Sequence, residues 1–332
     1  MRIAVDAYGG DNAPLEIIRG CKLAYDELKV DITLCGNEQE IRGILEKEAI
    51  DASIFEYADA QDILTMEDEP TSILKAKSNS SMAVAFKLVK DGKCDAVVSA
   101  GNTGALLVGA SMIVKRIKGV KRAALASVFP SQSGPVLLAD MGANVVCKPD
   151  YLVQFAMLGS EYMKNMHGVD NPRIGLLNNG TESHKGQQLQ QDSYQQLMSS
   201  NLNFIGNVEG RQLAMGGCDV IVTDGFTGNI ALKTYEGVGK MMSEGIKGIF
   251  KQNFITKIGA VFVLKQLNSF KKKFDYKEYG GAPLLGISKP VIKAHGSSDA
   301  KAIKNAIRQA VLYHDSGMIS VIENALADCE EE

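Results

Sequence analysis

A short apolar run followed by a glycine- and aspartate-rich turn, Arg2-Ile3-Ala4-Val5-Asp6-Ala7-Tyr8-Gly9-Gly10-Asp11-Asn12, sets the pattern of this chain. The same order returns at three further turns, residues 101–104, 140–144 and 224–229, and each turn precedes a segment with helical spacing. Such a turn places backbone N–H groups and a helix N-terminus at the carboxyl end of a strand, an arrangement that attracts phosphate and other anions. Several of these turns on one edge of a sheet would form a single crevice.

Strand-like and helix-like segments alternate along most of the chain. The runs predicted as strands are residues 3–6, 32–35, 53–57, 96–98, 123–129, 135–138, 174–177, 204–206 and 220–222. The segments between them carry the periodicity of amphipathic helices. Near-continuous apolar strands that alternate with helices predict an α/β fold of three layers, in which a doubly wound, mostly parallel sheet is covered on both faces.

The pattern changes after Asn229. Residues 230–273 carry helical spacing without a strand signal, which predicts two antiparallel helices at 230–250 and 254–270. We interpret residues 230–273 as a helical hairpin that projects from an α/β catalytic body made of residues 1–229 and 274–332. After the hairpin the sequence predicts a glycine-rich loop at 279–283, a strand near 290–292, and helices at 299–314 and 319–326.

The composition argues against several classes of function. The net charge of −3 gives no reason to expect nucleic-acid binding, and no apolar run is long enough to span a membrane. The six cysteines form no C-x-x-C pair, and the four histidines lack metal-ligand spacing. These patterns predict reduced thiols in a cytoplasmic protein without a metal site. Since no G-x-G-x-x-G or P-loop motif is present, no nucleotide cofactor is expected.

Seven motifs, in this order, closely resemble those of the phosphate acyltransferases of bacterial glycerolipid synthesis, the PlsX type. They are VDAYGGDNAP (5–14), GNTGA (101–105), DMGAN (140–144), GNVEGR (206–211), DGFTGN (224–229), GGAPLLG (280–286) and KAHGSSD (293–299). The resemblance extends from Met1 to about Leu326, with Tyr8 where the family usually has Met. It implies a homodimer whose fold is similar to that of isopropylmalate dehydrogenase and phosphotransacetylase.

The resemblance also implies a reaction. A long-chain fatty acyl group would pass from acyl-acyl carrier protein to inorganic phosphate, and a membrane glycerol-3-phosphate acyltransferase would use the acyl phosphate for phosphatidic acid and phospholipid synthesis. A phosphate oxygen must then be held in line with a thioester carbonyl. The carbonyl oxygen needs donors as it becomes an oxyanion, and a cation or acid near the thiolate assists its departure. No serine or cysteine nucleophile is required.

Lys185 is the first candidate for holding phosphate, because it follows a polar stretch and is expected to begin a helix. The alternative is a solvated surface lysine, which describes most lysines. His184 could donate to phosphate or to the leaving thiolate, or could be a solvated loop histidine. Together with Asn229 and Asp224, these two residues form the predicted catalytic set.

Polar residues in the turns are candidates for substrate binding. Those at expected helix starts, such as Asn102 and Thr227, could bind an anion, cap the helix, or do both. Aspartates that end strands, such as Asp6 and Asp224, could orient lysine side chains or fix the turns through local hydrogen bonds.

His295 precedes two serines, Ser297 and Ser298, one of which is expected to cap the following helix. His295 could act as a donor in the crevice or could pack structurally. The complete set predicted to bind phosphate or substrate is Asp6, Gly9, Gly10, Asn102, Thr103, Gly104, Asp140, Asn144, Thr227, Gly228, His295 and Ser297.

Two surfaces are candidates for partners. Residues 115–122 hold five basic side chains and could dock the acidic acyl carrier protein, or could be a solvated helix end. Residues 258–264 of the predicted hairpin are apolar and ringed by lysines, which suits an anionic membrane surface; a dimer interface or hairpin core is the alternative. We favour a mixture, in which one face of the hairpin packs in the dimer and its tip touches lipid. The expected membrane contacts are Ile258, Val261, Phe262 and Leu264, and the protein is expected to be cytoplasmic and peripherally membrane-associated.

Two other functions compete with this interpretation. One is a phosphotransacetylase that acts on acyl-coenzyme A, and the other is a noncatalytic membrane scaffold for lipid enzymes. A scaffold has no need for several anion-binding turns, which favours an enzyme.

Overall fold

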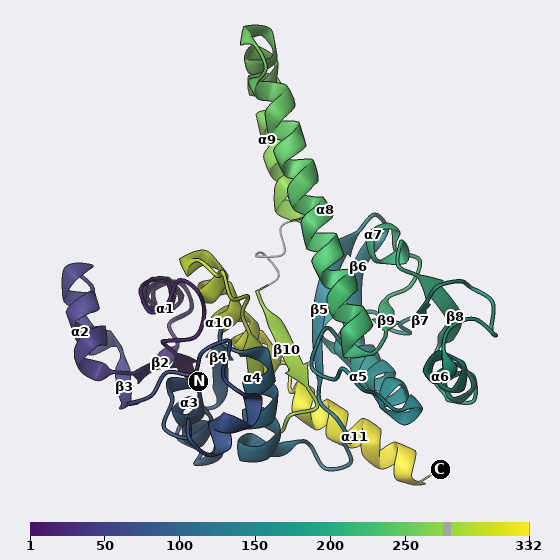
Figure 1. Ribbon diagram of the computed structural model, residues 1–332, viewed down its shortest axis with the longest axis horizontal. Coiled ribbons are helices and arrows are strands. Elements are labelled where there is room, and N and C mark those ends of the chain that lie inside the picture. The colour runs from purple at the N-terminus through teal and green to yellow at the C-terminus, as the bar shows by residue number, and fades with distance from the viewer. Residues whose placement is uncertain (275–279, 332) are drawn as a thin grey trace.

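The computed structural model describes residues 1–274 and 280–331, with the side chains of all of these except 264, 265, 267–274 and 328–331 (Figure 1). The strands are β1 (Arg2–Asp6), β2 (Asp31–Gly36), β3 (Glu56–Asp59), β4 (Ala96–Ser99), β5 (Ala124–Ser131), β6 (Gly134–Ala139), β7 (Ile174–Asn178), β8 (Phe204–Glu209), β9 (Val220–Val222), β10 (Ala282–Leu285) and β11 (Val291–Lys293). The helices are α1 (Leu15–Leu28), α2 (Glu38–Lys47), α3 (Ser81–Lys90), α4 (Thr103–Gly109), α5 (Pro149–His167), α6 (Gln188–Met198), α7 (Gln212–Met215), α8 (Gly225–Lys251), α9 (Phe254–Phe274), α10 (Ala300–Asp315) and α11 (Met318–Glu331).

Within the described residues the strands form one sheet of eleven, in the order β3-β2-β1-β4-β11-β10-β5-β6-β9-β7-β8. The first five strands of this order are parallel to one another, and so are the last four. Between these two groups, β10 and β5 form antiparallel pairs with each other and with β11 and β6. The two parallel groups therefore run in opposite directions.

The pairing register brings the carboxyl ends of both groups to one level of the sheet. Ala282 of β10 pairs with Lys293, the last residue of β11. Two residues further along β10, Leu284 pairs with Leu125 of β5. The next residue of β5, Ala126, pairs with Ala139, the last residue of β6. The strands of the two groups point toward each other, so the turns that follow them meet in the middle of the molecule.

Helices cover both faces of the sheet, because successive side chains of each buried strand point to opposite sides. Ile3 and Val5 of β1 pack in the cluster that includes α1 and α10, whereas Ala4 packs in the cluster that includes α3. Leu137 and Leu138 of β6 divide between two clusters in the same way, the first of them with α5. The predicted three-layer α/β fold with a mostly parallel sheet is confirmed.

Helices α8 and α9 form an antiparallel hairpin whose far part projects from the sheet and its covering helices (Figure 1). Both helices were predicted from the sequence. Helix α8 begins at Gly225, earlier than the predicted 230, and the carboxylate of Asp224 caps it by accepting the N–H of Thr227 at 2.8 Å. The first turns of α8 therefore belong to the body of the molecule and only the later turns project.

One strand was not predicted. Residues 279–283 were expected to form a loop, whereas 282–285 are the strand β10 and Tyr279 lies outside the described residues. The glycines and the proline of this stretch imitate a loop in the sequence. Because β10 is only four residues long and pairs on both sides, its neighbours in the sheet determine its conformation.

Two helix starts also differ from the prediction. Helix α6 begins at Gln188 and not at Lys185, since Gly186 between them has a φ of +87° and interrupts the helical path. Helix α10 is capped by Asp299, whose carboxylate accepts the N–H of Ala302 at 2.9 Å, and not by one of the two preceding serines.

The start of α8 is held by a close backbone approach, which predicts the effect of adding a methyl group. A Cβ at Gly228 would lie 1.8 Å from the carbonyl oxygen of Asp140. We expect Gly228→Ala to displace α8 and to lower the free energy of unfolding by about 1–3 kcal/mol, measured by urea denaturation. Gly239→Ala on the same helix meets nothing within 4 Å and should raise it by about 0.5–1 kcal/mol. Equal effects of the two changes would contradict this account.

Candidate functional site

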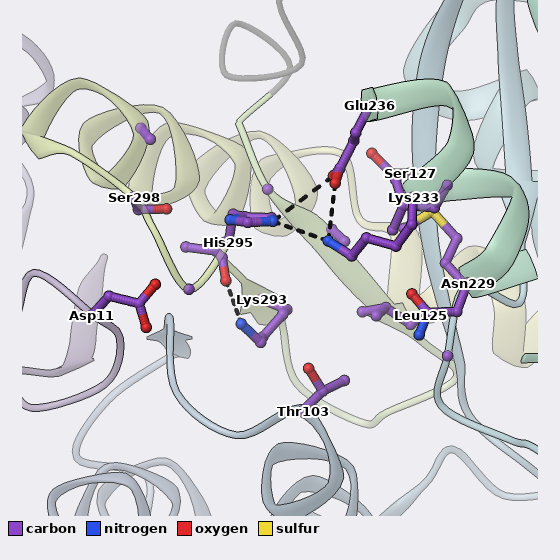
Figure 2. Close-up of a pocket in the computed structure, with 18 of the residues that line it drawn as sticks. Asp11, Thr103, Leu125, Ser127, Asn229, Lys233, Glu236, Lys293, His295 and Ser298 are labelled. Atoms are coloured by element: carbon purple, nitrogen blue, oxygen red, sulfur yellow. Dashed lines mark hydrogen bonds and ion pairs between the residues drawn. The ribbon is translucent and has the colours of Figure 1, made fainter. Parts of the chain in front are cut away.

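A cavity of about 410 Å³ opens where the carboxyl ends of the two strand groups meet (Figure 2). One wall is a face of β5, a second is the first turns of α8, and the segment between β11 and α10 lies opposite. Turns after β1 and β4 complete it. The polar and charged residues in its lining are Asp11, Thr103, Ser127, Asn229, Lys233, Glu236, Lys293, His295 and Ser298.

Lys293 is a buried cation at the edge of this cavity. It ends β11, is 8% exposed, and its Nζ donates to the carbonyl oxygens of Ala100 at 3.1 Å and Ala294 at 2.5 Å. Burial lowers the pKa of Lys293 to about 8; the carboxylate of Asp6 opposes this shift, and the charge of Lys233 adds to it. The ammonium group is therefore positioned by two carbonyls and has one hydrogen left for a ligand.

Asp6 supports Lys293 from inside the sheet and does not line the cavity. Its carboxylate, 2% exposed, accepts the hydroxyls of Ser81 and Ser99, each at 2.6 Å. Burial raises the pKa of Asp6, whereas the two serine hydrogen bonds and the charge of Lys293 lower it. Since Ser99 pairs with Lys293 in the sheet, the carboxylate and the ammonium lie on either side of one strand.

Lys233, Glu236 and His295 form a connected group that joins α8 to the segment between β11 and α10 (Figure 2). The Nζ of Lys233 lies 2.9 Å from Oε2 of Glu236 and 3.1 Å from Nε2 of His295. Burial and the charge of Lys233 lower the pKa of His295, whereas Glu236 raises it. The net shift is downward, so the imidazole is neutral near pH 7.

Both ring nitrogens of His295 have a neighbour at hydrogen-bond distance. Nδ1 lies 2.9 Å from the hydroxyl and 3.2 Å from the backbone nitrogen of Ser297, and Nε2 lies 3.1 Å from the ammonium of Lys233. Since an ammonium group can only donate, Nε2 accepts from Lys233 in this contact. With Glu236 and His295 as two of its partners, the Lys233 ammonium has a third hydrogen that can donate to an anion.

The structure brings three of the predicted residues into this cavity: Thr103, Asn229 and His295. Thr103 begins α4, and Asn229 follows the first turn of α8, so both lie near helix N-termini. The predicted residues outside its lining are Asp6, Gly9, Gly10, Asn102, Gly104, Asp140, Asn144, His184, Lys185, Asp224, Thr227, Gly228 and Ser297.

Several of these residues shape the turns. The buried carboxylate of Asp140 accepts N–H groups of its own turn and of Leu125, together with the side-chain amide of Asn144 at 2.9 Å. Asp224 accepts both the N–H and the hydroxyl of Thr227 at 2.8 Å. These contacts are the local turn hydrogen bonds that the sequence left open as an alternative.

Asn102 is also engaged within the protein. Its side-chain oxygen accepts the N–H of Ala105 at 3.1 Å, and its amide donates to the carbonyls of residues 65, 66 and 68 at 3.2–3.3 Å. Met66, which this amide holds, lines the cavity. Asn102 therefore caps α4 and positions a loop over the site.

Lys185 and His184 lie in the loop between β7 and α6 and not in the cavity. His184 is exposed and Lys185 is half-buried, and the carbonyl of Lys185 accepts the amide of Asn178 at 3.1 Å. Because α6 begins only at Gln188, the charge of Lys185 is not at the helix start where the sequence placed it.

Sequence reasoning missed Lys233, Glu236, Lys293 and Asp11. A signal existed for the first two, because they follow Asn229 by four and seven residues and therefore share its helix face. Lys293 closes an apolar strand, where a charged residue is unusual without a function or a partner. Among the described residues, no group of three or more histidine, cysteine and acidic side chains could hold a metal ion.

Comparison with known proteins identifies the family. The chain matches the family model described as "Fatty acid synthesis protein" over residues 1–321. The phosphate acyltransferase of Clostridium perfringens (strain SM101) is 46% identical over 328 residues, which cover 98% of this chain and 97% of that protein. The chain belongs to the phosphate acyltransferase family. A second member, from Acetivibrio thermocellus, is 45% identical over 333 residues that cover 100% and 98% of the two chains.

Membership of the phosphate acyltransferase family makes the protein an acyltransferase and supports transfer of an acyl group to phosphate. It confirms the resemblance drawn from the seven motifs and removes the noncatalytic scaffold as a description of the protein. The family members match nearly end to end, so the relationship covers the sheet, the cavity and the hairpin alike.

Solved structures share the fold. A phosphotransacetylase from Streptococcus pyogenes superposes with a TM-score of 0.64 at 17% identity, covering 96% of this chain and 94% of that one. A branched-chain phosphotransacylase from Enterococcus faecalis gives 0.55 at 14% identity, covering 94% and 98%. At these identities the likeness shows the fold alone, and it confirms the expected similarity to phosphotransacetylase.

The lowered pKa of Lys293 predicts how anion binding depends on pH. Sulfate keeps a constant charge between pH 6 and 10, so a change in its affinity with pH reflects protonation of groups in the protein. We expect sulfate binding to weaken at least about tenfold as pH rises through about 8, because the Lys293 ammonium loses its proton. Calorimetric titrations from pH 6.5 to 9.5 measure this.

Lys293→Arg is the matched control, since arginine stays protonated throughout this range. The pH dependence should disappear in this variant. An unchanged pH profile would show that another group controls anion binding.

Proposed function

We propose that this acyltransferase moves a fatty acyl group from acyl carrier protein to inorganic phosphate, which binds between Lys233, Lys293 and His295. The observation that carries the proposal is that two lysine ammonium groups, Lys233 and Lys293, line one cavity, with His295 3.1 Å from the first of them. Phosphate supplies acceptor oxygens for the remaining hydrogen of each ammonium group. Charge-assisted hydrogen bonds of this kind are about twice as strong as neutral ones.

The same residues suit the chemistry of acyl transfer. A phosphate oxygen held by the two lysines attacks the thioester carbonyl, the carbon–sulfur bond breaks, and the thiolate takes a proton from the cationic group beside it. Asn229 lies near the positive N-terminal end of α8 and can donate to the carbonyl oxygen as negative charge develops there. Thr103, at the start of α4, offers a hydroxyl from the opposite side.

The proposal also includes the identity of the acyl donor. The basic segment 115–122 is a candidate docking surface for acidic acyl carrier protein, because all five of its charged residues are exposed. One of them, Lys121, forms an ion pair with Asp150 at 2.8 Å. Acyl-coenzyme A is the alternative donor. The product, an acyl phosphate, would serve a membrane glycerol-3-phosphate acyltransferase.

A homodimer is proposed on the exposed apolar surface beside the site. Val146 is 86% exposed, and Phe226 and Ile230 on α8 are 58% and 53% exposed. Met241 continues the same side of the helix at 65%. An apolar surface of this extent is typical of an interaction surface.

Phosphate-dependent thiol release from palmitoyl-acyl carrier protein, with hydroxylamine trapping of acyl phosphate, tests the proposed reaction. We expect release only when phosphate is present. Lys233→Ala should lower kcat/KM for phosphate about 10²-fold, the usual effect of removing one donor to a reacting anion. Release without phosphate, or activity with acyl-coenzyme A alone, would contradict the proposal.

Lys185→Ala is the comparison for Lys233→Ala. The sequence favours Lys185, whereas the cavity contains Lys233 and Lys293. An equal loss in Lys185→Ala would assign Lys185 to the site after a movement of its loop or from a second copy of the chain.

We propose that the hairpin touches an anionic membrane. No helix among the described residues is long and apolar enough to cross one. Phe262 and Val261 are 78% and 72% exposed, and Ile258 is 46% exposed; the side chain of Leu264 lies outside the described residues. Exposed apolar residues on a helix with flanking lysines fit the interface between lipid and water.

Replacing Val261 and Phe262 together by Glu should release the protein from vesicles that contain anionic lipid, because it removes buried apolar area and adds repulsive charge. Vesicle cosedimentation measures the bound fraction. Activity on a donor in solution should stay unchanged, since these residues lie far along the hairpin from the cavity lining. Unchanged cosedimentation would refute membrane contact by this segment.

A further inference from the structure

Part of the cavity wall is apolar. Leu125 and Phe129 of β5 line it with Ser127 between them, because alternate residues of a strand share one face. Leu232 of α8 and Met141 after β6 complete this wall. A lining that combines cations with apolar side chains suits an amphiphile with an anionic head and a hydrocarbon tail.

Phe129 is the last residue of β5 that lines the cavity. The next residue on the same strand face, Ser131, is buried, and its hydroxyl donates to the carbonyl of Gly134 at 2.6 Å. The apolar wall therefore ends at the Phe129 ring.

The ring of Phe129 is held firmly. It is 2% exposed and packs edge to face against Tyr235 of α8, with 5.3 Å between ring centroids and 73° between ring planes. The hydroxyl of Tyr235 donates to the carbonyl of Pro130 at 2.7 Å. Val136 of β6 pairs with Phe129 from the other side and is itself buried. Phe129 cannot turn aside without breaking these contacts.

We propose that Phe129, held by Tyr235, closes the apolar end of the cavity and sets the length of the acyl chain that the cavity accepts. This inference rests on the proposed function for the identity of the tail, and it adds a residue that determines specificity. Tyr235 is a positioning residue, since it acts through Phe129 and does not line the cavity.

The physical consequence is a break in the relation between chain length and affinity. Each methylene that leaves water for the apolar wall tightens binding about fourfold. Once the chain reaches Phe129, a further methylene must displace a packed ring or stay in water, so this gain ends.

A series of alkyl phosphates from butyl to dodecyl, below their micelle concentrations, measures the break by calorimetry. In the unaltered protein we expect affinity to rise about fourfold per methylene and then to level off. Phe129→Ala, and to a smaller extent Phe129→Leu, should move the break to a longer chain. Tyr235→Phe, which removes only the hydrogen bond to Pro130, should blunt the break because the ring gains mobility.

Phe204→Ala is the matched control. Phe204 of β8 packs edge to face on Tyr194 with the same centroid distance of 5.3 Å and does not line the cavity. Its loss should destabilise the protein while the break stays where it is. The proposal would be overturned if both Phe129 variants kept the break at the chain length of the unaltered protein. It would also be overturned if Phe204→Ala moved the break as far as Phe129→Ala does.

The acyl-transfer assay distinguishes a failure of this inference from a failure of the proposed function. If acyl transfer depends on phosphate but Phe129→Leu leaves the break at the same chain length, the role of Phe129 is overturned and the proposed function stands. Absence of phosphate-dependent transfer from every acyl donor overturns the function, while a Phe129-dependent break with alkyl phosphates would still support the apolar site.

Discussion

The reversal of strand direction between the two halves of the sheet is the constraint on which the site depends. Strands β10 and β5 are antiparallel to each other and to their outer neighbours, so the parallel groups on either side run toward one level. The two groups are also offset along the strand direction, so the turn after β11 and the turn after β6 come to the same level of the sheet. The cavity forms where they meet, and each side contributes a cation, Lys293 from β11 and Lys233 from α8.

The two cations are held in different ways, and the difference matters for binding an anion. Lys293 is buried, with its Nζ fixed by two carbonyls and its charge balanced by Asp6 behind the strand. Lys233 is more exposed and is held by Glu236 and by the ring of His295. A fixed charge and an adjustable one together can admit a phosphate group and follow it as the acyl group is transferred.

The fold was largely predictable because most strands of this chain are buried apolar runs that alternate with helices. The strand β10 was not, since its glycines and proline resemble a loop and only its neighbours make it a strand. Local turn chemistry was predictable too: Asp224 and Asn102 cap the helices that follow them.

The site was less predictable, because the sequence places a residue along one element but does not show which elements meet. His295, Asn229 and Thr103 were found through their turns. Lys233 looks like any surface lysine until β11 brings His295 within 3.1 Å of it. Lys185 follows a polar stretch and was expected to begin a helix, yet the helix begins after Gly186 and the loop leaves Lys185 outside the cavity.

Helix α8 links the cavity to the projecting hairpin through a single continuous element. Its first turns supply Asn229, Lys233 and Glu236 to the cavity, and its 27 residues extend about 40 Å, to the turn that leads into α9. An acyl phosphate has a charged head and an apolar tail, so it is poorly suited to free diffusion in water. A helix that forms part of the cavity and also carries the exposed apolar hairpin keeps the site of synthesis at a fixed distance from the proposed lipid surface. The rigidity of α8 is therefore as relevant to the proposed function as the side chains that it presents.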